Sequence, residues 1–178
     1  VAHSFPGPPT QPHDMLAYLN TKLAAAYERP GAGFVTAFYG IFNPVSRILT
    51  YSSAGHTPPR IRRADGTVEA LMGARDLPLG IAPGIAYTQD DVALHTGDLL
   101  LLYTDGITEA QDPAGKLYGE ARLDHILQSS KSDPGWAIAA LLEDVRIFTK
   151  DRPATDDRTV VAAEVHDALP TTSQTARA

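Results

Sequence analysis

The 178-residue sequence contains no cysteine, which excludes both disulfide bonds and thiolate metal sites. It also lacks any apolar run near the roughly 20 residues that a membrane helix needs. The longest such run, Leu99 to Tyr103, has only the length of a strand. The start, Val1 to Gln11, is rich in proline and has no basic segment of the kind that opens a signal peptide. These absences favour a cytoplasmic protein without membrane contact.

Positive charge is scarce. Fifteen Lys and Arg stand against 21 Asp and Glu, for a formal net charge of -6. A nucleic-acid-binding surface needs a basic patch, and the densest basic group, Arg60, Arg62 and Arg63, is accounted for by alternation within a strand. We therefore expect no nucleic-acid partner.

Length and composition suit one globular domain, with 43% hydrophobic and 20% charged residues. We assign residues 1–166 to this domain. Residues 167–178 are polar and small, without periodicity, and are predicted to be a disordered tail. The chain begins with Val1 rather than Met, so we expect further polypeptide upstream in the parent protein.

The pattern of apolar residues predicts a helix, then a series of antiparallel strands, then two helices and a last strand. This order indicates an α+β fold in which helices pack on sheets. The expected helices cover 12–27, 118–128 and 134–148, and the expected strands cover 34–42, 47–53, 59–63, 67–71, 86–94, 99–103 and 159–165.

Acidic residues occur at two strand ends. Asp105 follows the apolar run 99–103 and precedes Gly106, and the pair Asp156 and Asp157 lies just before the strand 159–165. Carboxylates held together there could bind Mg²⁺ or Mn²⁺, which prefer oxygen ligands. Each motif alone is also compatible with an ordinary solvated turn.

Five segments in order resemble the SpoIIE/RsbU branch of the metal-dependent (protein phosphatase 2C-like) serine/threonine protein phosphatases. The resemblance extends from about residue 14 to residue 165. The segments are FVTAFYG (34–40), LTYSSAGHTPP (49–59), LPLGI (77–81), GDLLLLYTDGITEA (97–110) and DDRT (156–159).

This resemblance implies an α-β-β-α sandwich, in which two antiparallel sheets lie between outer helices. It implies removal of phosphate from phosphoserine or phosphothreonine in a partner protein, typically an anti-sigma-factor antagonist in stress or sporulation signalling. Two Mg²⁺ or Mn²⁺ ions would activate the attacking water. A sensor domain upstream in the parent chain is also implied.

Carried over by position, Asp105 and Asp156 match metal ligands of the family. The neighbouring Asp157 could bind metal or support the site, and Gly106 would allow close packing there. His56 lies in a family motif, and we expect it to be hydrogen-bonded in a tight turn rather than catalytic. No protein nucleophile is implied.

One part of the family pattern is missing. Its first motif joins a Gly-Asp strand end to a Gly-rich acidic turn, whereas the only Gly-Asp here, Gly97-Asp98, belongs to a later strand. The domain is therefore expected to be N-terminally truncated. Two remaining aspartates cannot supply a two-metal cage, so we predict weak metal binding and little activity unless the missing part is present. Exposed sheet edges would also invite homodimer formation.

Two rival interpretations follow from the same residues. Haloacid-dehalogenase-type phosphatases place a nucleophilic aspartate two residues before a strand-end Asp, but here that position is Tyr103. A catalytically degenerate phosphatase fold that serves as a binding or scaffold module stays open, although retention of Asp105 and Asp156 favours the enzyme.

Overall fold

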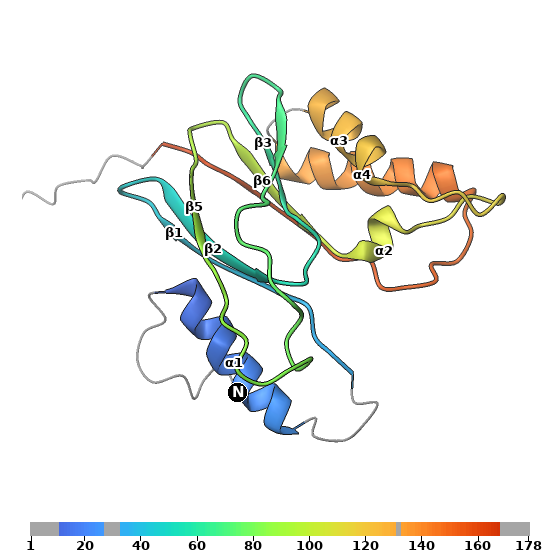
Figure 1. Ribbon diagram of the computed structural model, residues 1–178. Coiled ribbons are helices and arrows are strands. Elements are labelled where there is room, and N and C mark those ends of the chain that lie inside the picture. Colours follow the sequence, from blue (N-terminus) through green and yellow to red (C-terminus); the bar gives the residue numbers. More distant parts are fainter. Residues whose placement is uncertain (1–10, 27–32, 131–132, 168–178) are drawn as a thin grey trace, which may run out of the picture.

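The structure, a computed structural model, describes residues 11–26, 33–130 and 133–167 (Figure 1). The predicted Pro-rich start, and the predicted tail except for Asp167, lie outside these residues. In chain order the elements are α1 (Pro12–Ala26), β1 (Ala37–Asn43), β2 (Ile48–Ala54), β3 (Arg60–Arg62), β4 (Val68–Ala70), β5 (Asp90–Ala93), β6 (Leu99–Tyr103), α2 (Asp105–Thr108), α3 (Glu120–Ser129), α4 (Pro134–Thr149) and β7 (Val160–Glu164).

The strands form two antiparallel sheets. One has the order β1-β2-β5 and the other the order β4-β3-β6-β7. Helix α1 packs on β1 and β2, while α3 and α4 cover the outer face of the second sheet, as Figure 1 shows. The predicted α-β-β-α sandwich is confirmed.

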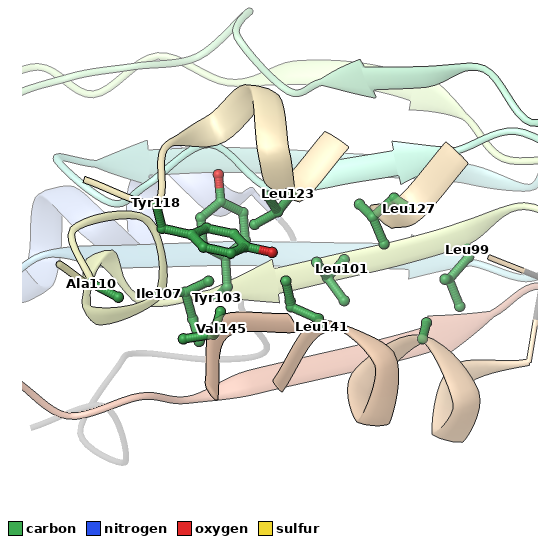
Figure 2. Close-up of a cluster of buried hydrophobic side chains, with 11 residues drawn as sticks. Leu99, Leu101, Tyr103, Ile107, Ala110, Tyr118, Leu123, Leu127, Leu141 and Val145 are labelled. Atoms are coloured by element: carbon green, nitrogen blue, oxygen red, sulfur yellow. The ribbon is translucent and has the colours of Figure 1, made fainter. Parts of the chain in front are cut away.

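The largest apolar core lies between the second sheet and helices α3 and α4. The side chains of strand β6 point alternately to the two faces of the sheet, and those of its odd-numbered residues face the helices (Figure 2). The N-terminus of helix α4 is capped by Asp133, whose carboxylate accepts a hydrogen bond from the Trp136 N–H. Pro134 occupies the first helical position, which favours helix initiation. The fully enclosed members of this core include Leu99, Leu101, Ile107, Leu123, Leu127, Leu141 and Val145.

The two sheets enclose a second core around Tyr51 and Ile61. The first sheet has three described strands and the second has four, and strand β7 is partly exposed. Val161 on β7 is 52% exposed, and Phe42 on β1 is 39% exposed. In the described part of the chain, β1 and β7 each have a single strand neighbour, in line with the predicted exposed edges.

The structure corrects several sequence predictions. The strand expected over 86–94 is confined to β5, and the helix expected from residue 118 begins at Glu120. The short helix α2 was not predicted, because four residues are too few for a helical repeat to be visible. Asp98, in the Gly97-Asp98 pair before β6, is 1% exposed and accepts hydrogen bonds from His95 N and Arg63. None of the helices in the described residues is both long and apolar enough to cross a membrane.

Candidate active site

Strand β6 delivers Asp105 to one end of the second sheet. The strand ends at the buried Tyr103, Thr104 is the N-cap of α2, and Asp105 is its first residue, with its side chain exposed. Thr104 holds the neighbouring chain segment: its Oγ1 donates to the Asp157 carbonyl (2.9 Å) and accepts from the Thr159 N–H (3.0 Å). The strand end is therefore fixed to the segment that precedes β7.

Gly106 packs directly against that segment. A Cβ atom at position 106 would lie 2.4 Å from the carbonyl oxygen of Asp157 and 3.4 Å from that of Asp156. Arg158 strengthens the contact by donating from Nε to the Gly106 carbonyl at 3.1 Å. The structure thus brings Asp105 and Asp156 onto adjoining backbone segments, and Gly106 allows the close packing that the sequence suggested.

A small hollow of about 40 Å³ lies beside Asp105, and His56 forms part of its wall. The imidazole is half-buried, and burial lowers its pKa while the charge of Asp105 acts in the opposite direction. Among the described residues its ring makes no hydrogen bond, so the bond expected in a tight turn is not found. The other wall residues are Thr36, Gly55, Thr57 and Thr104.

A buried arginine lies beside Tyr103, the last residue of β6. Arg60 is 2% exposed, its Nη1 donates to the Pro58 carbonyl at 2.8 Å, and its guanidinium lies 5.8 Å from the centre of the Tyr103 ring. It pairs with Asp124 (2.7 Å) and Glu120 (2.9 Å) on α3. Burial raises the pKa of Tyr103 to about 12, partly opposed by Arg60, so the phenol stays neutral.

The sequence did not single out Thr36, Thr57, Thr104 or Arg60. The threonines lie within three of the segments that resemble the phosphatase family. This resemblance was the one feature of the sequence that could have identified them as site residues. Alternation of Arg60 with its neighbours suggested an exposed face, whereas the ion pairs with α3 allow its burial.

The donor set fits a divalent-cation site only in part. Asp105 and Asp156 offer the carboxylate oxygens that Mg²⁺ and Mn²⁺ prefer. The described residues, however, contain no cluster of three or more His, Asp or Glu side chains that could hold a metal ion. Within this part of the chain the site is therefore short of ligands.

Comparison with known proteins gives one family and several relatives. The model of the family described as Stage II sporulation protein E (SpoIIE) matches residues 1–166. Phosphoserine phosphatase RsbU of Bacillus subtilis (strain 168) is 36% identical over 84 residues, which are 47% of this chain and 25% of RsbU. Protein IcfG of Synechocystis is 32% identical over 101 residues, which are 57% of this chain and 16% of IcfG.

Solved structures share the fold. The SiaA-PP2C domain of Pseudomonas aeruginosa matches with a TM-score of 0.74 at 20% identity, over 87% of this chain and 61% of that one. The PP2C phosphatase domain of SpoIIE from Bacillus subtilis, with a fragment of its regulatory domain, gives a TM-score of 0.65 at 25% identity. That match covers 75% of this chain and 39% of the other. The chain spans a quarter or less of the two curated relatives.

Proposed function

This chain belongs to the SpoIIE family, and from that premise we propose that it removes phosphate from phosphoserine or phosphothreonine in a partner protein. The observation that carries the proposal is the packing of Gly106 against the Asp156–Asp157 segment, because it joins the two acidic motifs at one place. The printed function of RsbU, a phosphoserine phosphatase, supports the same reaction class.

The substrate we propose is a phosphorylated anti-sigma-factor antagonist. It is supported by the likeness to a Mycobacterium tuberculosis protein, Rv1364c, whose solved structure contains RsbU and RsbW domains. An upstream sensor domain, homodimer formation and a cytoplasmic location stay predictions from the sequence.

We propose Mn²⁺ or Mg²⁺ as the cofactor, with Asp105 and Asp156 as ligands and Asp157 and Gly106 in support. A solved SpoIIE phosphatase domain was presoaked with Mn, and RsbX was solved in complex with magnesium. Bound ions would supply an activated water and neutralise charge on the phosphoryl group. The described residues contain no group of three or more acidic or histidine side chains that could hold a metal ion, so we propose that further carboxylate ligands come from outside them. We therefore expect the 178-residue chain alone to bind metal weakly and to have little activity.

The residues of this chain have a positioning role in the proposal. Thr104 and Arg158 tie the two acidic segments together, and the Arg60 guanidinium lies over the ring of Tyr103, the last residue of β6. Rigid placement of the reacting groups is a large part of what an enzyme contributes.

The test is release of phosphate from a phosphoserine peptide, with a phosphotyrosine peptide of the same sequence as control. Both are assayed with Mn²⁺ for this chain and for one extended upstream in the parent gene. We expect phosphoserine hydrolysis that is stronger in the extended chain. Metal-independent hydrolysis, or silence in both chains, would favour the scaffold alternative or another chemistry.

A further inference from the structure

His56 is held in place from both sides. Gly55 has φ +67°, its N–H donates to the Asp76 carbonyl at 2.8 Å, and a Cβ there would lie 2.4 Å from Pro78. On the other side, the Thr57 hydroxyl donates to the Tyr103 carbonyl at 2.6 Å. The position of His56 relative to the end of β6, and so to Asp105, is therefore fixed by contacts that do not involve its ring.

The ring itself is available to a ligand. Two other histidines have polar partners: His13 lies 2.6 Å from Gln89 Oε1, and His166 lies 3.4 Å from Glu164. The His56 imidazole has no hydrogen-bond partner in the described part of the chain, although it is half-buried. Its ring nitrogens are not among the buried, unpartnered polar atoms of the described residues, so they are accessible to solvent and therefore to a ligand.

The hollow beside His56 has few other donors to offer. The hydroxyls of Thr57 and Thr104 already donate to backbone carbonyls, at Tyr103 and Asp157. His56 and Thr36 are the remaining side-chain donors in the wall, which also includes Asp105. At about 40 Å³ the hollow has room for about three water-sized groups, the size of a set of phosphoryl oxygens.

A second, larger cleft adjoins this hollow. It has a volume of about 220 Å³ and shares Thr36, His56 and Thr104 with the hollow. Its remaining wall is mostly apolar and includes Phe38 and Val161. His56 therefore stands where a polar recess meets an apolar cleft, an arrangement suited to a phosphate ester with a carbon chain behind it.

We propose that His56 donates a hydrogen bond from its imidazole N–H to a phosphoryl oxygen of the bound phosphoserine or phosphothreonine. This inference rests on the proposed function and adds to it a substrate-contacting residue. Asp105 is excluded from this task because its carboxylate only accepts hydrogen bonds and repels a phosphate in the absence of a cation.

The test uses the chain extended upstream in the parent gene, with Mg²⁺ at constant pH and inorganic phosphate as the probe. The imidazole signals of the histidines are followed by NMR, and the His56 signal is identified by its absence from His56→Asn. We expect phosphate to shift the His56 signal, and His56→Ala to weaken phosphate binding about tenfold or more. His56→Asn, which keeps an N–H donor, should recover part of the affinity. His95→Ala, at the opposite end of β6, should leave the affinity unchanged.

An unshifted His56 signal at high phosphate, or equal affinity in wild type and His56→Ala, would overturn the inference. The proposed function has a separate criterion, namely hydrolysis of the phosphoserine peptide that is lost in Asp105→Asn. Hydrolysis that depends on Asp105 but is unaffected by His56→Ala would therefore remove His56 from the substrate site and leave the phosphatase assignment standing.

Discussion

Gly106 and Asp157 are in van der Waals contact through their backbones, so closely that position 106 has no space for a side chain. A Cβ atom there would lie 2.4 Å from the Asp157 carbonyl oxygen, well inside the closest approach of a carbon to an oxygen. This contact joins residues 51 positions apart in the sequence and holds the two acidic motifs next to each other.

Gly106→Ala is predicted to push these segments apart. The strain should lower the free energy of unfolding by about 1–3 kcal/mol, the usual cost of overpacking. Metal affinity should fall as well, because Asp105 and Asp156 move with their segments. Thermal unfolding and Mn²⁺ titration would measure the two effects. Gly33→Ala is the control, since no atom lies within 4 Å of the added methyl group, and equal behaviour of the two variants would refute the close-packing argument.

Arg60→Met is predicted to destabilise the fold by about 2–4 kcal/mol. Removing one partner of a buried ion pair leaves the charge of the other partner uncompensated. Because the side chains of Asp124 and Glu120 are 33% and 58% exposed, the loss of stability should be smaller than for a fully buried pair. Unfolding in urea measures the difference. Arg146→Met serves as the control, because Arg146 forms its ion pairs at the surface and its loss should change little. A neutral Arg60→Met would mean that this cluster contributes no stability.

Sequence reasoning located both acidic motifs because each lies next to an apolar run that reads clearly as a strand. It could not find what surrounds them. The Thr57 hydroxyl meets the Tyr103 carbonyl across 46 positions, and Arg60 meets Asp124 across 64 positions. Contacts of this kind depend on how the sheets and helices pack together. The local pattern of apolar residues does not predict that packing.

Contacts between residues far apart in the sequence also explain where the structure differs from the sequence predictions. His56 was expected to find a hydrogen-bond partner in its own turn, but the turn is held by its neighbours Gly55 and Thr57 instead. Gly97-Asp98 is a common turn sequence, and nothing in the neighbouring residues indicates that Asp98 is buried. Its burial depends on Arg63, which approaches to 2.7 Å from a different strand end.

The ion pair between α3 and α4 is predicted to make stability fall in acid. Arg122 and Tyr118 both donate to the Asp144 carboxylate, at 2.7 Å, and Arg122 beside it lowers the pKa of Asp144 below its ordinary value of 3.8. Because the folded-state pKa is the lower one, this stabilisation is complete above the unfolded value and is lost as the pH falls through the folded value.

Asp144→Asn should lower the free energy of unfolding by about 1–3 kcal/mol at neutral pH, as expected for charge-assisted hydrogen bonds. The difference from wild type should shrink as the solution is acidified below about pH 4. Urea unfolding across that range is the measurement. A difference that stayed constant with pH would show that Asp144 acts through packing and not through its charge.

The most direct test of the central claim is Mn²⁺-dependent hydrolysis of p-nitrophenyl phosphate by the upstream-extended chain and its Asp105→Asn variant. Asp91→Asn is the matched control, since Asp91 is an exposed carboxylate on β5. The account predicts that Asp105→Asn loses at least about 100-fold in rate, in the range for removal of a key electrostatic group, while Asp91→Asn keeps the full rate. Equal rates in all three proteins would contradict the assignment of Asp105 to the phosphatase site.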